Sequence, residues 1–379
     1  MSPIEIRELG HGAAFSDWVA VPVLVHKDDP HFIRQLDIKE RLRIARWFSP
    51  FFKTGTAAFF VAYRGGRPVG RVSAQVNPAF QALHDPDAGH FGFFDCIDDM
   101  DVSNALFGAA RAWLALRGCR SVIGPFSLTI NEESGLLVDG FDEPAAMLMD
   151  QSRPYAARLV EGAGFSKAMD AYAFRVRGSV DATPIRKLAR LALEGGELTV
   201  RKARGERFAD EMRQFVEIFN DAWSGNWGFV PWTDADVRAM ARDIKPFFRD
   251  EFGAVVEIGG QPVGFAMIIP DFNEVIASFG GRLLPFNWWR LYRDMKDVRS
   301  RRFRIPLLGI RREYQRSVLG AKILALLVTA LLEKTPLRAY DWVELSWVLE
   351  ANRPMFSLCR MAAGAPAKQY RFYRAEIPS

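Results

Sequence analysis

The chain has 379 residues, of which 49% are apolar and 25% are charged. This length and composition exclude a disordered protein and predict two globular domains. The net charge of +5 is too small to indicate nucleic-acid binding, and we expect none. It does suit an anionic ligand or an anionic membrane surface.

Cysteine usage and the N-terminal residues both predict a cytoplasmic protein. The three cysteines form no CxxC pair and indicate neither a disulfide framework nor a zinc site, so no metal is expected. Residues 1–12 lack the apolar core of a signal peptide. The longest apolar run, residues 323–332, is too short to span a bilayer. We therefore expect any membrane contact to be peripheral, on the inner face.

The expected elements follow one order twice along the chain. In the first half, periodicity predicts strands at residues 57–63, 69–76, 91–97, 121–125 and 172–176, and helices at 103–116 and from 155. In the second half it predicts strands at residues 253–258, 263–269, 303–310, 342–347 and 370–373, and helices at 319–332 and from 355. Each half is therefore expected to be a mixed α/β sheet.

Short sequence matches support this internal repeat. GGRPVG at residues 65–70 recurs as GGQPVG at residues 259–264. An Arg-Pro pair and an Ala-Gly pair also recur in the same order and at nearly the same offset. These matches predict two tandem copies of one fold, residues 1–195 and 196–379, with a linker near residues 194–196.

Residues 307–321, LLGIRREYQRSVLGA, form an apolar strand followed by a turn that opens a helix. A helix N-terminus offers free backbone N–H groups and a favourable dipole, which together bind phosphate. The stretch resembles the CoA signature of the GNAT acyltransferase superfamily, [QR]-x-x-G-x-[GA]. Gln315 and Gly320 match this signature, whereas Val318 replaces its first glycine. The alternative interpretation is an ordinary helix start.

The resemblance covers nearly the whole chain. It implies two tandem GNAT-like folds, each a mixed, mostly antiparallel sheet flanked by helices. It also implies that the C-terminal copy binds acyl-CoA as a co-substrate, with contacts from Leu308, Ile310, Gln315, Arg316, Ser317, Val318, Leu319, Gly320, Ala321 and Asn352. Pro306 is expected at a strand bulge, where the pantetheine would enter.

The first copy lacks this signature. Its corresponding turn, residues 98–101, reads DDMD, and carboxylates there would repel a pyrophosphate. We interpret this run as a solvated turn rather than a metal site. The N-terminal copy is therefore expected to shape the substrate site without binding CoA.

GNAT enzymes catalyse direct attack of an amine on a thioester, which implies a general base for the ammonium proton. We predict Glu344 as this base, because burial among apolar neighbours would raise its pKa, and Glu274 as the next candidate. Cys359 stands where many members have a tyrosine that protonates the leaving thiolate. It is either that acid or a buried structural cysteine.

Two regions are predicted to contact the acceptor. Residues 226–232 lie where GNAT proteins shape the acceptor site, and residues 280–304 interleave aromatic with basic side chains. The second pattern is typical of a membrane interface, or of a helix packed by its aromatics with a solvated basic face. The expected substrate-binding residues are Asn226, Trp227, Trp232, Asp271, Asn273, Glu132, Glu133, Trp288 and Trp289.

These features together resemble a tandem-GNAT group that includes the bacterial ceramide synthases. The resemblance implies N-acylation of a sphingoid-type amine by a fatty acyl-CoA. The alternatives are a small-molecule N-acetyltransferase and a non-catalytic regulator that binds acyl-CoA. A Fem-type aminoacyltransferase is a further tandem relative, but the long basic coiled-coil insertion that some of those carry is missing here.

Overall fold

The computed structural model describes residues 2–178, 182–334 and 340–378, and it confirms the mixed α/β class. The elements of the first half are β1 (Ile4–Leu9), β2 (Gly12–Ala13), α1 (Phe15–Val25), α2 (Asp37–Ile44), β3 (Thr56–Arg64), β4 (Arg67–Val76), α3 (Pro78–Leu83), β5 (Ala88–Cys96), α4 (Met100–Ala115), β6 (Ser121–Gly124), β7 (Leu136–Asp139), α5 (Ala156–Gly162) and β8 (Ser166–Val176).

The second half repeats this order with insertions. Its elements are α6 (Thr183–Glu194), β9 (Leu198–Lys202), α7 (Phe208–Trp223), α8 (Asp234–Ile244), β10 (Gly253–Ile258), β11 (Gln261–Pro270), α9 (Phe272–Ile276), α10 (Asn287–Lys296), β12 (Arg302–Ile310), α11 (Val318–Lys334), β13 (Trp342–Leu349), α12 (Arg353–Ala363) and β14 (Lys368–Glu376). Every strand and helix expected from the sequence has a counterpart here. The expectation missed the strands and helices that open each half.

The matching glycine pairs form the two hairpin turns. Gly65 and Gly66 have φ of 56° and 76°, and Gly259 and Gly260 have φ of 55° and 77°. A two-residue turn with positive φ at both positions matches the right-handed twist of the flanking strands, and glycine adopts it without strain. The repeated GG motif therefore reflects one backbone requirement that is met twice.

Each half is a three-layer sandwich, because strand alternation sends successive side chains to opposite faces. In the first half, Phe59 packs in the cluster with α1, and Phe60 packs in the cluster with α4. In the second half, Val255 belongs to the cluster of α7, and Val256 belongs to the cluster of α11. Helix α6 packs against α11 and so lies with the second half.

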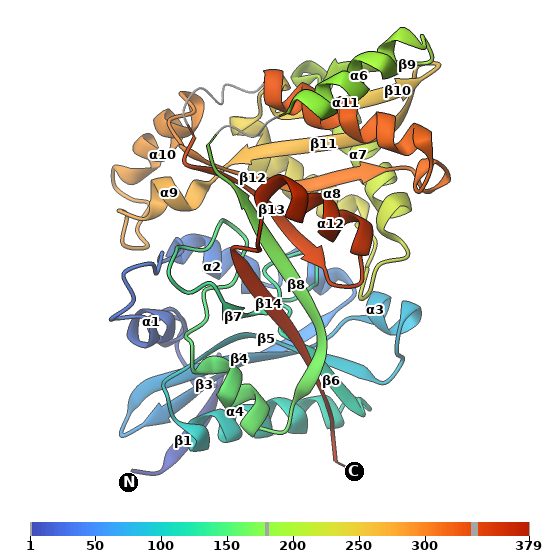
Figure 1. Ribbon diagram of the computed structural model, residues 1–379. Coiled ribbons are helices and arrows are strands. Elements are labelled where there is room, and N and C mark those ends of the chain that lie inside the picture. The colour runs from blue at the N-terminus through green and yellow to red at the C-terminus, as the bar shows by residue number, and fades with distance from the viewer. Residues whose placement is uncertain (1, 179–181, 335–339, 379) are drawn as a thin grey trace.

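The last strands of the two halves are exchanged. The described strands form one fourteen-stranded sheet, in which β8 pairs with β13 of the second half and β14 pairs with β6 of the first half. Strands β8 and β14 also pair with each other, and Figure 1 shows them running side by side through the middle of the molecule. The division into two domains at residue 195 stays a prediction. Helix α6 precedes this residue but packs with the second half, and β8 and β14 each pair with a strand of the other half.

Buried ion pairs accompany this exchange. Asp170 on β8 accepts two hydrogen bonds from Arg371 on β14, at 2.8 and 3.1 Å. Burial alone would raise the pKa of Asp170, but the hydrogen bonds from Arg371 and Lys167 hold it below its usual range. Across the other edge of β8, Arg175 pairs with Glu344 of β13 at 2.9 Å. These charges favour one register of the exchanged strands.

We predict that neither half folds by itself. A fragment of residues 1–178 would leave both edges of β8 unpaired, and a fragment of residues 179–379 would lack the strand between β13 and β14. Thermal unfolding followed by circular dichroism should show no cooperative transition for either fragment. Co-expression of the two should restore a soluble complex with a cooperative transition. A cooperative transition of one fragment alone, near that of the intact chain, would contradict this prediction.

Candidate functional site

The turn between β12 and α11 is built as the N-terminus of a helix. The Ser317 hydroxyl accepts a hydrogen bond from the backbone N–H of Gly320 at 3.0 Å and donates one to the Tyr314 carbonyl at 2.6 Å. The first helical bond runs from the N–H of Ala321 to the carbonyl of Ser317. The N–H groups of the preceding helical residues therefore have no carbonyl one turn earlier and point out of the helix end.

Gly320 is required by the close approach of the backbone. A Cβ at this position would lie 2.3 Å from the Tyr314 carbonyl oxygen. The departure at Val318 is tolerated because its side chain is 76% exposed and blocks nothing in the turn. The turn therefore keeps the geometry of the signature although its first glycine is replaced.

The Gln315 side chain stabilises this turn through two hydrogen bonds. Its Nε2 donates to the carbonyl of Ile310 at 2.9 Å and to the carbonyl of Ala222, next to the last residue of α7, at 3.1 Å. Arg311 and Arg316 add positive charge on the same turn. A braced helix N-terminus with nearby arginines is suited to hold a pyrophosphate.

Strand β12 separates from β13 where the sequence predicts it. Parallel pairing ends at Ile305 and Leu345, and the register of β12 against β11 shifts around Pro306. Aromatic side chains lie at the separation: the Trp223 indole donates to the Leu308 carbonyl at 3.2 Å, and its ring contacts Trp347 at 6.2 Å between centroids. Figure 1 shows β12 and β13 diverging on the side away from α9 and α10.

The equivalent separation in the first half is closed by the chain itself. The N–H of Phe126 donates to the Phe91 carbonyl at 2.7 Å, and Gln75 donates to the Phe126 carbonyl. The N-terminus of α4 is capped by Asp99, whose carboxylate accepts from the N–H groups of Asp101 and Val102. The Phe126 segment takes backbone space there, and Asp99 occupies two of the N–H groups that could otherwise bind a pyrophosphate.

The structure places Glu344 in a polar network rather than among apolar neighbours. It is fully buried, and its two oxygens accept from Arg175 at 2.9 Å and from the Ser346 hydroxyl at 2.7 Å. Arg304 in turn donates to Ser346 at 2.9 Å. The expected apolar environment was wrong, because strand exchange brings Arg175 of the first half beside β13. The role of Glu344 as a base stays a prediction.

The other predicted catalytic residues have structural partners. Glu274 accepts hydrogen bonds from the Ser300 hydroxyl and from two backbone N–H groups at residues 301 and 302. Cys359 packs with Phe174 and Val348, where burial raises the pKa of its thiol to about 12. Asn352 caps α12 by accepting from the N–H of Met355 at 3.3 Å. These contacts fit the structural alternative for Cys359, while the roles predicted for Glu274 and for the CoA contact Asn352 stay predictions.

Asp271 keeps one carboxylate oxygen free. Its Oδ1 accepts from the N–H groups of Met147 and Asn273, at 3.0 and 3.1 Å. Its Oδ2 is buried and has no hydrogen-bond partner among the described residues. Burial raises the pKa of Asp271 to about 7. Asn273 donates to the Ala145 carbonyl and accepts from Gln35, so both residues join the halves at one point.

The predicted acceptor loop lies between the two halves. Trp227 stacks near Phe126 and Phe372, and the Asn131 side chain donates to the backbone carbonyl of Val230. The backbone N–H of Trp232 donates to Asn220 at 2.9 Å. Asn226 lies in the same loop, where its carbonyl accepts from Phe229. The loop therefore closes over the junction of β14 with the first half.

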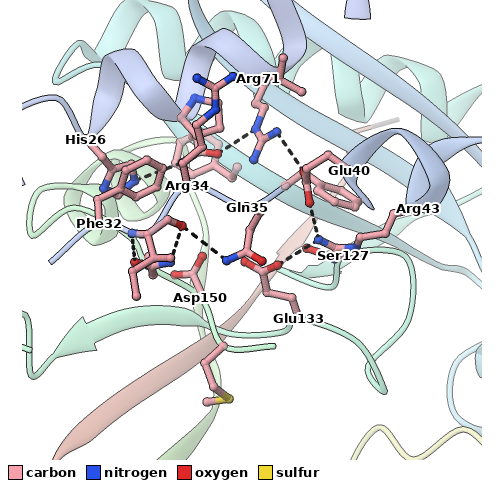
Figure 2. Close-up of a pocket in the computed structure, with 18 of the residues that line it drawn as sticks. His26, Phe32, Arg34, Gln35, Glu40, Arg43, Arg71, Ser127, Glu133 and Asp150 are labelled. Atoms are coloured by element: carbon pink, nitrogen blue, oxygen red, sulfur yellow. Dashed lines mark hydrogen bonds and ion pairs between the residues drawn. The ribbon is translucent and has the colours of Figure 1, made fainter. Parts of the chain in front are cut away.

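A cavity in the first half collects a chain of charged side chains (Figure 2). His26 lies 3.4 Å from Asp95, which accepts from Arg71 at 2.8 Å. Arg71 approaches Glu40 at 3.5 Å, and Glu40 accepts from Arg43 at 3.0 Å. Arg43 continues to the predicted substrate residues Glu133, at 3.1 Å, and Glu132, at 3.4 Å.

Asp150 also lines this cavity, and sequence reasoning missed it. Burial, and then the nearby charge of Glu133, raise the pKa of Asp150 to about 7. Burial likewise raises the pKa of Glu132 to about 7. The cavity wall is formed by segments that are far apart in the sequence, so no local residue spacing predicts the cavity. The cavity volume is about 70 Å³.

Comparisons with known proteins assign the family. No family model matches the chain. It is 37% identical to protein YghO of Escherichia coli over 362 residues, which is 95% of this chain and 92% of that protein. It is 36% identical to the bacterial ceramide synthase of Caulobacter vibrioides over 371 residues, which is 96% of this chain and 95% of that protein. The chain belongs to the family of these two proteins.

Solved structures assign the fold of this family. A tandem GNAT protein from the clavulanic acid biosynthesis pathway has a TM-score of 0.54 at 13% identity and covers 100% of this chain and 99% of its own. A GCN5-related N-acetyltransferase from Sphaerobacter thermophilus has a TM-score of 0.54 at 11% identity, with coverages of 100% and 98%. The family member described here therefore has the tandem GNAT fold.

The described residues of this family member include neither a bilayer-spanning helix nor a metal-binding cluster. No helix among them is both long and apolar enough to cross a bilayer. No group of three or more His, Cys, Asp or Glu among them could hold a metal ion.

We predict that Asp150→Asn stabilises this tandem GNAT protein at high pH. The folded pKa of Asp150, about 7, lies above the usual value of an aspartic acid, 3.8. The unfolded chain therefore releases this proton first as the pH rises, and the folded state loses stability between about pH 4 and pH 7. Differential scanning fluorimetry should show a Tm a few degrees higher than wild type at pH 8, and no difference at pH 4.

Asp170→Asn is the control of opposite sign. Its folded pKa is lowered, so its ion pair adds stability above the unfolded pKa and loses it as the pH falls. This variant should lower the Tm at pH 8. An Asp150→Asn variant that is also less stable at pH 8 would show that its carboxylate stabilises the fold.

Proposed function

We propose that the protein is an acyl-CoA-dependent N-acyltransferase that transfers a long acyl chain to a lipid amine of the sphingoid type. The observation that carries this proposal is the 36% identity, over 96% of the chain, to a protein named bacterial ceramide synthase. The turn after β12 supports the use of acyl-CoA, because its helix N-terminus and arginines suit a pyrophosphate.

Acyl-CoA would bind the second half alone. Its pyrophosphate would lie on the backbone of residues 316–321, and its pantetheine would enter between β12 and β13 beyond Ile305. In the first half the corresponding gap is filled by Phe126, and the corresponding helix is capped by Asp99. This difference between the two copies supports binding of the acyl donor by the second half alone.

In the proposed reaction, the amine nitrogen attacks the thioester carbonyl. A carbon–nitrogen bond forms, the carbon–sulfur bond breaks, and CoA leaves as a thiolate. The nitrogen loses two protons in all, of which one neutralises the thiolate and the other is released. Among the predicted acids we favour Asp271 over Glu344 and Glu274 as the group that accepts a proton, because Asp271 combines a free oxygen with a pKa of about 7.

We predict that purified protein converts sphinganine and palmitoyl-CoA to the N-acyl product, measured by mass spectrometry. Val318→Glu should raise the KM for palmitoyl-CoA at least tenfold, because it places a negative charge on the proposed pyrophosphate site. Val318 is preferable to Gly320 for this test, since any side chain at Gly320 collides with Tyr314 and disturbs the turn itself.

Two variants control this experiment. Val318→Gln has the same size without the charge, and it should leave the KM within about twofold of wild type. Asp101→Asn changes the matching helix of the first half and should also have no effect. If acetyl-CoA on a soluble amine outperforms the lipid pair, the protein is a small-molecule N-acetyltransferase. If acyl-CoA binds but no amine is acylated, it is a regulator.

A lipid acceptor is supported by the surface of α10 and the turn before it. Leu284 and Phe286 are 70% and 78% exposed, and Trp288, Trp289 and Tyr292 are also exposed. Basic residues surround them, namely Arg282, Arg290, Arg293, Lys296 and Arg299. The alternative interpretation expected these aromatic side chains to be packed against the domain, but they are exposed. Exposed aromatics beside arginines suit peripheral contact with an anionic membrane.

We predict that anionic liposomes capture the protein at low salt and release it at high salt, since screening shortens the reach of each charge. Flotation should show this directly. Trp288→Ala with Trp289→Ala should weaken capture and slow acylation of sphinganine presented in liposomes. The same variant should acylate a micellar amine at the wild-type rate. Equal flotation of variant and wild type would contradict the assignment of α10.

A further inference from the structure

The cavity of the first half has a feature that acyl-CoA binding leaves unexplained: its carboxylates outnumber its guanidinium groups. Glu40, Asp95, Glu133 and Asp150 face Arg43 and Arg71 inside it, and Glu132 also reaches Arg43. The lining also includes Asp37, which pairs with Arg34, together with Lys39 and His26, so five carboxylates face four lysine and arginine side chains. The interior therefore favours a ligand that carries positive charge.

We propose that this cavity binds the ammonium headgroup of the acyl acceptor, with Asp150 and Glu133 as its counter-charges. The proposal rests on the proposed function and assigns the acceptor to the first half. The donor and the acceptor would then use the two copies of the fold differently, one for CoA and one for the amine.

Asp150 is held so that one oxygen is available. Its Oδ2 accepts from the N–H groups of Leu137 and Ser152, at 2.9 and 3.0 Å, and from the Ser152 hydroxyl. Among the described residues, no hydrogen bond reaches its Oδ1. In Figure 2 the side chains of Asp150, Gln35 and Glu133 converge on the same part of the cavity. An ammonium group there could contact two carboxylates at once.

Tyr370, which lies outside the lining but close enough to feel the charge of Asp150, has a second polar group without a partner in the described part of the chain. Tyr370 on β14 is fully buried, and its hydroxyl has no hydrogen-bond partner among the described residues. Burial, with the charges of Glu344 and Asp150, raises its pKa well above the usual value, so it stays a neutral donor. An unsatisfied buried hydroxyl is costly, and a polar group of the substrate would satisfy it.

The cavity lies close to the point where β12 leaves β13. Met147 accepts from Arg304 of β12 at 2.5 Å, and its N–H donates to Asp271 at 3.0 Å. Asp150 is three residues further along the same segment, and three residues span at most about 11 Å. The segment from Met147 to Asp150 thus connects the cavity with the separation of the two strands, where the thioester would be held.

At about 70 Å³ the cavity has room for the headgroup, and apolar residues of its wall suit the first carbons of the chain. Phe32, Phe93, Leu136 and Met149 contribute apolar surface to its wall. Its entrance segment, residues 33–37, packs on Ile276, Phe279, Leu283 and Leu291, and the N–H of Asp37 donates to the Gly281 carbonyl at 2.9 Å. The entrance is thus continuous with the exposed aromatic surface of α10. A lipid amine leaving a membrane at α10 would meet the cavity first.

The test uses Asp150→Asn and Glu133→Gln, which keep the shape and remove one charge. Each should raise the KM for sphinganine at least tenfold and leave the KM for palmitoyl-CoA within about twofold. Sphinganine in nonionic micelles should raise the Tm of wild type, whereas uncharged N-acetylsphinganine should not, and each variant should lose most of this rise. Because Asp150→Asn is expected to be more stable at pH 8, loss of binding there cannot be ascribed to unfolding.

Glu5→Gln is the matched control, since its carboxylate lies outside the cavity lining and is bound by two nitrogens of Arg7. It should leave both KM values unchanged. If the amine is acylated and its KM is unaffected in Asp150→Asn and Glu133→Gln, the cavity assignment is wrong and the proposed function stands. If no amine is acylated but sphinganine stabilises wild type more than the two variants, the cavity assignment stands and the proposed function fails.

Discussion

The pairing of β8 with β13 and β14 is the constraint on which the rest of the structure depends. It inserts a strand of the first half into the sheet of the second half, so neither sheet is complete without the other. The exchange brings Arg175 against Glu344. In the segment before β8, Met147 contacts Arg304 and Asp271 of the second half. The same pairing therefore supplies both the stability of the sheet and the junction where the two halves meet.

Two copies of one fold diverge here through small changes in backbone access. In the second half, a serine cap and a glycine keep the helix N-terminus open, and β12 leaves β13 at Pro306. In the first half, a segment around Phe126 occupies the equivalent gap, and an aspartate caps the helix. A backbone amide used internally cannot also bind an anion; Asp99 takes two such amides in the first half, whereas Ser317 takes one in the second.

The polar groups of the cavity work against stability. Burial raises the pKa of Asp150 and Glu132 to about 7, which means that the folded protein spends free energy to hold these carboxylates charged at neutral pH. A bound cation would remove that cost. Binding sites commonly contain groups that lower the stability of the fold but are needed for function.

The sequence by itself determined the local features. The GG hairpins, the strand bulge at Pro306 and the helix start at Ser317 depend on backbone conformations that few residues adopt, so a short motif reveals them. The periodic apolar pattern likewise determined the two sandwiches, because neighbouring residues along one strand or helix set which face is buried.

Only the tertiary structure decided which strand pairs with which, and with it the site. The pattern of β8 is the same whether it pairs within its own half or with β13, since a strand's alternation does not specify its partner. The partners of Glu344 and the contacts of Asp271 follow from that pairing, whereas the cavity around Asp150 forms between segments of residues 19–151. They join residues more than a hundred positions apart, and no local pattern in the sequence carries that information.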